Sequence, residues 1–194
     1  FYLAAQNNSQ MKISKRLFLI LAIGALPLFL MAQVPAKSKA WEPLLFLIGE
    51  WRGEGIADST SGEYTRSYQF VLGNRFIEVK NRSVFPPSAQ NSQGEIHEDH
   101  GFLSYDKSDK KFIMRQFHIE GFVNQYRLDS ISPDGLKIVF ITEAIENIPA
   151  GWKAKESYEV ISNDEFIETF ELAAPGKAFE VYSKVRLKRV VPQQ

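Results

Sequence analysis

The sequence contains no cysteine and only three histidines among its 194 residues. Without cysteine the chain has no disulfide, no thiolate metal site, no thiol nucleophile and no lipid-modified cysteine, so its core alone must stabilise the fold. The G-x-S-x-G, P-loop and glycine-rich dinucleotide motifs are also missing. The sequence therefore carries none of the signals that mark the common hydrolases and nucleotide-binding proteins.

An excess of basic residues is missing as well. Residues 1–32 hold three basic and no acidic side chains, so leaving them out gives 20 of the 23 basic residues against 23 acidic ones, a net charge of −3. Nucleic acids and anionic membrane surfaces attract proteins through clustered positive charge. Neither is expected as a partner of this protein.

The first 32 residues have the composition of an export signal. Lys12, Lys15 and Arg16 precede the apolar run LFLILAIGALPLFLMAQ, which is shorter than the roughly 20 residues that span a bilayer. We expect cleavage after Ala32, export to the periplasm or the medium, and no stable membrane insertion; an uncleaved anchor is the alternative. The expected division is a possible non-native leader at 1–10, a signal peptide at 11–32, a linker at 33–40 and one β-barrel domain at 41–191.

From residue 41 onward, about ten strand-like segments alternate with turn signals, and only AWEPLLFL (residues 40–47) looks helical. A spacing of about 8–12 residues between turns is typical of all-β folds. Strands joined by short turns form a meander, and closing it removes the two open edges. We therefore expect an antiparallel up-and-down β-barrel of about ten strands, wide enough for a ligand cavity. A two-sheet sandwich is the alternative.

Alternation along the strands predicts which side chains face the interior. Three of these positions, Arg66, Glu156 and Glu168, are charged. They either satisfy one another, lie at a wet barrel end, or orient a ligand in a water-filled cavity. The full inward set is Tyr64, Arg66, Tyr68, Phe70 and Leu72; Leu136, Ile138 and Phe140; Trp152, Glu156, Tyr158 and Val160; Phe166, Glu168 and Phe170; and Phe179, Val181, Val185, Leu187 and Arg189.

The segment RQFHIEGFVNQY places polar groups on a strand rich in aromatics. Met114, Gln116 and His118 share one face, directly before a hairpin at Glu120-Gly121. A neutral imidazole near the rim has three possible roles: it ligates a metal or haem iron, it donates to a ligand, or it hydrogen-bonds the turn.

The segment EIHEDHG is rich in residue types that bind metals, but their alternation along a strand argues against a metal site. On a strand, His97 and Asp99 point one way while Glu98 and His100 point the other. A zinc site needs at least three ligands on one side. We therefore expect a solvated strand entry rather than a metal centre.

The segment LIGEWRGEG carries the Gly-x-Trp pattern, Gly49 and Trp51, of the calycin barrels. The resemblance to lipocalins and fatty-acid-binding proteins implies that the tryptophan plugs one barrel end beneath an arginine from the last strand. Arg189 has the matching position in the alternation.

A wider resemblance covers about residues 41–190. The segments EPLLFLIGEWRGEG, YQFVLGNRFIEV, GEIHEDHGFLSYD, FHIEGFVNQY, TEAIENIPAGW and FEVYSKVRLKRV are similar to the nitrobindin-like haem-binding β-barrel proteins, and in particular to their exported bacterial relatives. The resemblance implies ten antiparallel strands, with ferric haem in the open mouth held by a histidine near the C-terminus. FEVYSKVRLKRV has no histidine, so His118 is the candidate substitute.

We expect an exported barrel that binds a small hydrophobic or amphipathic ligand without transforming it, with haem as the leading candidate and fatty-acid-like molecules next. Arg66 would meet an anionic end of the ligand, and the loop FPPSAQNSQG would form a rim or lid. The alternatives are a haem-dependent isomerase or peroxidase-like enzyme, an acid–base enzyme using Glu156 and Glu168, and a filled structural barrel. The expected binding residues are His118, Met114, Gln116, Asn124, Tyr126, Arg66, Tyr68, Phe140 and Trp152.

Overall fold

The structure is a computed structural model that describes residues 39–56, 62–89 and 91–191. The expected signal peptide at 11–32 lies outside these residues, as does nearly all of the expected linker. Among the described residues, no helix has the length and apolar character needed to span a bilayer.

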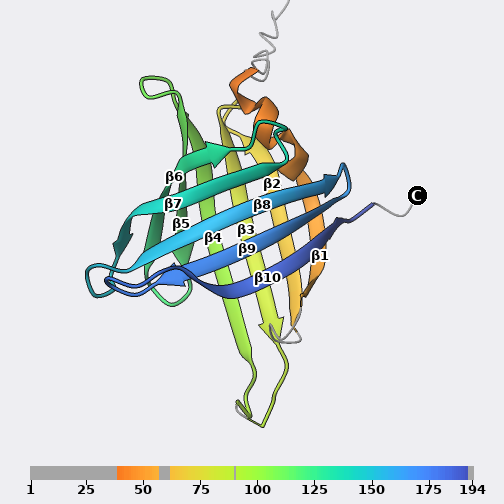
Figure 1. The fold of residues 1–194 in the computed structure, drawn as a ribbon. Coiled ribbons are helices and arrows are strands. Elements are labelled where there is room, and N and C mark those ends of the chain that lie inside the picture. Colours follow the sequence, from red (N-terminus) through yellow and green to blue (C-terminus); the bar gives the residue numbers. More distant parts are fainter. Residues whose placement is uncertain (1–38, 57–61, 90, 192–194) are drawn as a thin grey trace, which may run out of the picture. The chain divides into compact units, whose positions relative to one another are not determined.

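Ten antiparallel strands form a closed barrel in which each strand pairs with its neighbour in sequence and β1 pairs with β10 (Figure 1). The predicted all-β, ten-stranded up-and-down barrel is confirmed, and the sandwich is not what forms. The strands are β1 (Gly49–Gly55), β2 (Glu63–Val71), β3 (Phe76–Phe85), β4 (Glu95–Asp106), β5 (Lys111–His118), β6 (Val123–Ile131), β7 (Lys137–Glu146), β8 (Lys153–Ser162), β9 (Glu165–Ala173) and β10 (Glu180–Arg189).

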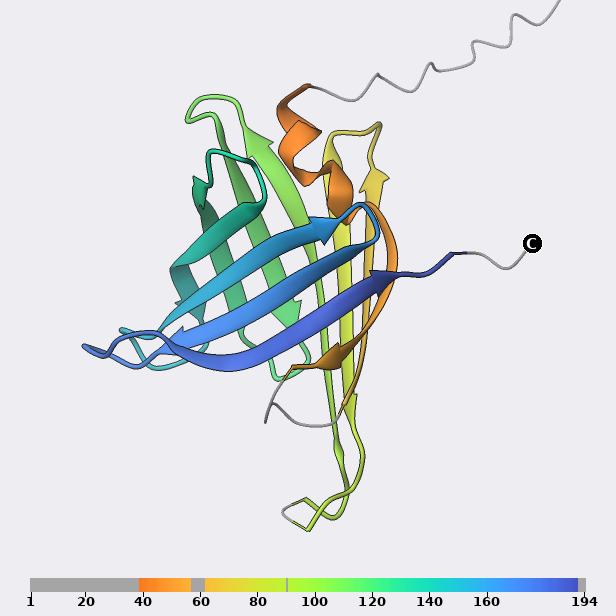
Figure 2. The same cartoon turned by 45° about the vertical axis from the view of Figure 1, so that its right-hand side comes forward.

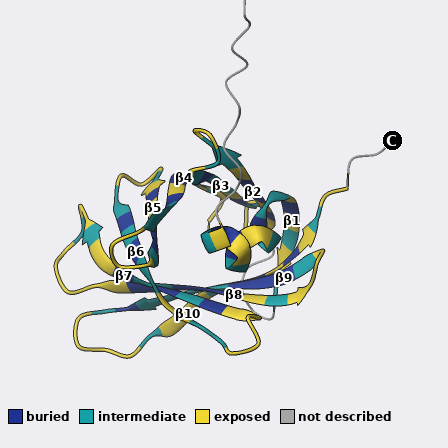
Figure 3. Ribbon diagram, turned by 90° about the horizontal axis from the view of Figure 1, so that it is seen from above, coloured by how far each residue is buried: buried dark blue, intermediate teal, exposed yellow. Residues whose placement is uncertain are grey.

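A short 3₁₀ helix, η1 (Lys39–Leu47), lies at one end of the barrel, as predicted for the segment before the first strand. Figure 3 shows it inside the ring of strands when the barrel is viewed along that end. Trp41, Leu44 and Leu47 are buried and belong to the hydrophobic core. Burying this apolar face excludes water from the interior at the η1 end.

Trp51 and Arg189 complete the closure at the η1 end, as the Gly-x-Trp pattern predicted. The Arg189 guanidinium lies 4.2 Å from the centre of the Trp51 ring and donates to the Ile48 carbonyl oxygen at 2.6 Å. The Trp51 indole N–H donates to the Leu47 carbonyl oxygen at 2.7 Å. Gly49 has a φ of 129°, and a Cβ there would lie 2.7 Å from Arg189 Nη1. Glycine is therefore needed for both the backbone conformation and the space.

Most of the predicted inward set is buried, and four of its members are wrong. Phe179 contacts Lys155 on the outer face of the barrel. Leu72 is 71% exposed because it lies in the β2–β3 turn with a φ of 50°. Leu136 is 48% exposed because it precedes β7. Val181 is 61% exposed because a register shift between Val181 and Ser183 reverses the alternation in β10. Bulges and turns interrupt the period of two on which the prediction depended.

We expect Arg189→Met to lower the free energy of unfolding by about 2 kcal/mol, because it removes the cation–π contact and the bonds to backbone carbonyls that seal the η1 end. Arg186→Met is the matched control. Arg186 lies on the outer face of the same strand and pairs with Glu165, so its loss should cost less than about 1 kcal/mol. Urea denaturation measures both, and equal losses would contradict this role for Arg189.

Candidate functional site

A cavity of about 560 Å³ lies inside the barrel at the end opposite η1. It is lined by residues of β2–β10 at the end of the barrel away from η1, together with the β5–β6 and β7–β8 turns. Its volume falls within the range of about 300–1,000 Å³ that is typical of ligand pockets. The barrel is therefore filled at one end and hollow at the other.

A layer of polar side chains forms the floor of this cavity. Each of seven strands contributes one inward residue, and apolar core residues such as Tyr68, Met114 and Phe166 lie on the η1 side of the layer. The members of the polar layer are Arg66 on β2, Asn81 on β3, Asp99 on β4, Gln116 on β5, Asn124 on β6, Glu156 on β8 and Glu168 on β9.

Arg66 and Glu168 form a buried ion pair in this layer. Arg66 Nε lies 3.0 Å from both carboxylate oxygens of Glu168, and Nη2 lies 2.5 Å from Oε1. Nη1 donates to the carbonyl oxygens of Thr65 and Arg82. Burial lowers the pKa of Arg66, and the pairing with Glu168 more than offsets this, so the net direction is upward. The guanidinium is thus held by the protein itself.

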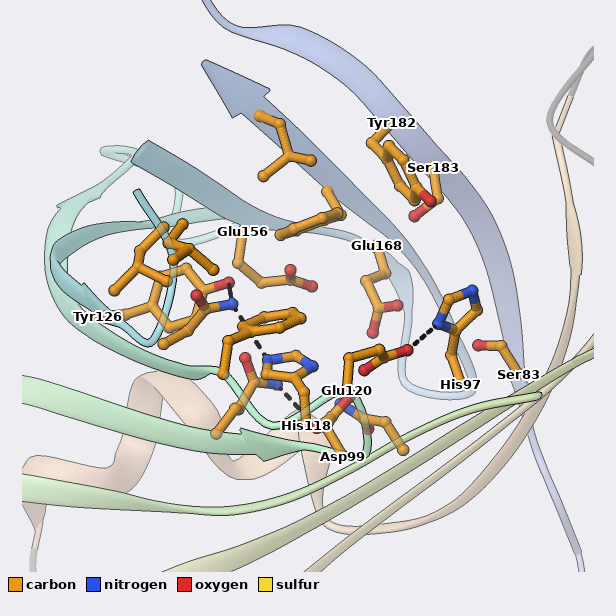
Figure 4. Close-up of a pocket in the computed structure, with 18 of the residues that line it drawn as sticks. Ser83, His97, Asp99, His118, Glu120, Tyr126, Glu156, Glu168, Tyr182 and Ser183 are labelled. Atoms are coloured by element: carbon orange, nitrogen blue, oxygen red, sulfur yellow. Dashed lines mark hydrogen bonds and ion pairs between the residues drawn. The ribbon is translucent and has the colours of Figure 1, made fainter. Parts of the chain in front are cut away.

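Glu156 and Asp99 are the other acidic members of the polar layer. Burial raises the pKa of Glu156 well above its ordinary value of 4.5, and the neighbouring Glu168 raises it further. Burial also raises the pKa of Asp99 from 3.8 to about 7, although Asn81 Nδ2 and Gln116 Nε2 donate to it at 3.0 and 3.2 Å. Both carboxyl groups therefore hold their protons more tightly than they would in water. Figure 4 shows the carboxyl groups of Glu156 and Glu168 pointing into the same space.

His118 lies at the cavity wall beside the β5–β6 turn. Its Nε2 accepts a hydrogen bond from Asn124 Nδ2 at 3.1 Å, and Asn124 Nδ2 also donates to the Tyr126 hydroxyl at 3.0 Å. The imidazole stacks on Phe122 with ring centres 4.1 Å apart. Burial lowers the pKa of His118 from 6.5 to about 4, so the imidazole is neutral near pH 7.

Aromatic and aliphatic side chains surround the mouth. Trp152 lines the cavity and is 38% exposed, and Phe170 packs edge-on against Tyr182. At the rim, His97 contacts Glu120 through Nδ1 and Glu95 through Nε2. The cavity therefore has a polar floor, apolar upper walls and a charged rim, an arrangement that suits an amphipathic molecule.

The structure brings together six of the nine expected binding residues. His118, Gln116, Asn124, Tyr126, Arg66 and Trp152 all line the cavity. Met114, Tyr68 and Phe140 do not; they are buried in the hydrophobic core. The β3–β4 loop extends beyond the open end (Figure 2). Of the expected rim segment, Phe85 is the described residue that lines the cavity.

Several cavity residues were not among the expected binding residues, including Asn81, Asp99, Glu120, Phe122 and Tyr182. The alternation in EIHEDHG correctly put His97 and Asp99 on one face, and that face is the cavity wall. The outward face is also as predicted, since Glu98 contacts Arg82 and His100 contacts Glu78. Within the described ranges, no three acidic or histidine side chains converge as a metal site would require.

Comparison with known proteins identifies the family. The family model described as "THAP4-like, heme-binding beta-barrel domain" matches residues 40–189. This chain belongs to that family. The resemblance to nitrobindin-like haem-binding barrels is thereby confirmed, and the THAP4-like domain accounts for the barrel from the start of η1 to the end of β10.

Among solved structures, the THAP4-like domain is similar to the crystal structure of Rv2717c from M. tuberculosis, with 16% sequence identity and a TM-score of 0.60. The alignment covers 80% of this chain and 100% of that one. At this identity the likeness concerns the fold. No match was found among curated proteins.

We expect Glu156→Gln to make stability less dependent on pH. Above pH 4.5, an unfolded chain gives up the Glu156 proton, whereas the folded chain, whose Glu156 pKa is raised, keeps it. Stability therefore falls as pH rises, by at most about 1.4 kcal/mol for each pH unit from one such group. Glutamine removes this contribution, so the variant should gain stability over wild type as pH rises from about 5 to 8.

Unfolding by urea across this pH range measures the effect, with Glu159→Gln, an exposed position on the same strand, as control. Asp99 acts in the same direction as Glu156, while His118, whose pKa is lowered, loses stability as pH falls below 6.5. Asp99 and His118 are present in wild type and in both variants, so their contributions cancel in the comparison. Parallel pH profiles for wild type and Glu156→Gln would show that Glu156 ionises freely.

Proposed function

We propose that the protein is a carrier that binds a small amphipathic ligand inside the barrel without transforming it. The observation that carries this proposal is the cavity of about 560 Å³ with its polar floor and aromatic mouth. The family, a heme-binding β-barrel domain, supports ligand binding in the barrel. The composition of residues 11–32 supports the further proposal that the carrier is exported to the periplasm or the medium.

Binding is favoured over acid–base catalysis by the state of the two glutamates. Glu168 is fixed by three contacts with Arg66, which removes Glu168 as the reaction partner of Glu156. An enzyme using this pair would need both carboxyl groups available to the substrate.

We expect the purified protein to bind Nile red, an uncharged hydrophobic dye, in this cavity. Ser183→Trp, which puts a large ring on the cavity wall, should weaken dye binding by at least about tenfold. Ser130→Trp, at an exposed position on β6, should leave it unchanged. Fluorescence titration gives the affinities, and circular dichroism checks folding. Undiminished binding by a folded Ser183→Trp variant would place the dye elsewhere.

Haem is the specific ligand that the family description names, and His118 fits iron ligation. Its imidazole is neutral near pH 7 and lines the cavity, and both are required of a haem ligand. Ligation through Nε2 would replace one hydrogen bond, the one from Asn124. Bound haem would supply an iron centre for small ligands or electron transfer. The aromatic mouth would cover its apolar surface.

We expect hemin to bind with a sharp Soret band that is lost in His118→Ala. His100→Ala is the matched control, because His100 lies on the outer face and contacts Glu78, and it should bind hemin like wild type. Absorption titration of the three proteins makes the comparison. An identical Soret band in His118→Ala would exclude His118 as the iron ligand, and no saturable change in wild type would exclude haem.

A further inference from the structure

Two side-chain amide oxygens of the polar layer are hydrogen-bond acceptors without a donor. Asn81 Nδ2 and Gln116 Nε2 are both used on Asp99, and Asn124 Nδ2 is used on His118 and Tyr126. The amide oxygens of Asn81 and Asn124 are buried without a hydrogen-bond partner. Buried acceptors without donors are unfavourable, and the unpaired donors that the same region holds are the hydroxyls of Tyr64 and Tyr68, not N–H groups.

The charged groups that line the cavity also favour a positively charged ligand over a negatively charged one. Four carboxyl groups line it, from Asp99, Glu120, Glu156 and Glu168. Among the described lining residues, the one lysine or arginine is Arg66, and Glu168 already holds its guanidinium. A carboxylate entering from outside would therefore find no free cation at the floor with which to pair.

Glu156 is the unmatched member of the layer. Its side chain is 6% exposed and lines the cavity, and no described residue donates a hydrogen bond to it. The titratable groups that face it come from several strands: Arg66 and Tyr68 on β2, Asp99 on β4, Tyr126 on β6, Tyr158 on β8 and Glu168 on β9. The one cation among them is taken by Glu168. A buried carboxyl group without a donor calls for a partner with N–H groups.

Resting on the proposed ligand-binding function, we propose that the cavity takes an amphipathic organic base, with its ammonium group at Glu156 and its apolar part between the rings of the mouth. An ammonium group supplies the three N–H donors and the positive charge that the floor lacks. The mouth supplies Phe122, Trp152, Phe170 and Tyr182, whose ring faces attract cations and cover apolar surface. The carboxylate of a fatty acid is better solvated at the rim.

Three compounds with the same eight-carbon chain test this selectivity: octylamine, octanoate and octanol, titrated calorimetrically near pH 7.5. Wild type should bind octylamine at least about tenfold more tightly than octanoate. Glu156→Gln, which keeps the shape of the side chain, should lose about tenfold for octylamine and less than about twofold for octanol. The exposed control Glu159→Gln should match wild type with all three.

A second readout is proton release. The pKa of Glu156 is raised in the empty protein, so an arriving ammonium group should drive a proton from Glu156 into the buffer. The heat of octylamine binding should therefore depend on the ionisation enthalpy of the buffer, and this dependence should be smaller in Glu156→Gln.

The outcomes separate this inference from the proposed function. Octanoate binding as tight as octylamine binding, or an unchanged amine preference in Glu156→Gln, would overturn the inference while leaving the carrier intact. Binding of Nile red with none of the three octyl compounds bound would do the same. If neither the dye nor any octyl compound binds, the carrier function fails and the inference fails with it.

Discussion

Pairing of β1 with β10 is the constraint on which the rest of the structure depends. It joins segments more than a hundred residues apart and brings Arg189 opposite Trp51 in the register, so the seal at the η1 end exists only in the closed ring. Closure also leaves no strand edge open to another chain. With ten strands, the ring is wider than its own side chains fill. The helix and core side chains occupy one end, and the cavity is the space that they leave at the other.

The polar layer separates the filled η1 end from the cavity. The pairing among its side chains determines which of them remain available to a ligand. Arg66 and Glu168 are 102 residues apart in the chain. They meet because both side chains point into the barrel, one from β2 and one from β9. Each neutralises the charge of the other in a place where a lone charge would be costly. Asp99 accepts hydrogen bonds from the side-chain amides of Asn81 and Gln116. Glu156 has no such partner, and its carboxyl group lines the cavity.

The sequence allowed prediction of the fold more fully than of the site. Alternation and turn spacing predicted the barrel, and the resemblance to calycin barrels predicted the position of Arg189 above Trp51. Alternation failed at Leu72 and Val181, where a turn and a register shift break the period of two. The acidic floor was partly visible, since Glu156 and Glu168 were expected to face inward. Arg66 was expected to face inward with them, and mutual pairing was one of the expected arrangements. That Arg66 pairs with Glu168 rather than with Glu156 was not predicted, because pairing across the barrel depends on how strands from distant parts of the chain are staggered, which local patterns do not encode.

The three tryptophans lie in different surroundings. Trp41 and Trp51 are sealed in the core at the η1 end, whereas Trp152 is partly exposed at the mouth among the rings that would surround a ligand. The Trp41 and Trp51 indoles would therefore not contact a ligand in the cavity, whereas the Trp152 indole would. Intrinsic fluorescence can therefore report ligand binding: the emission of Trp152 would change when the cavity is filled, while the emission of Trp41 and Trp51 would stay constant.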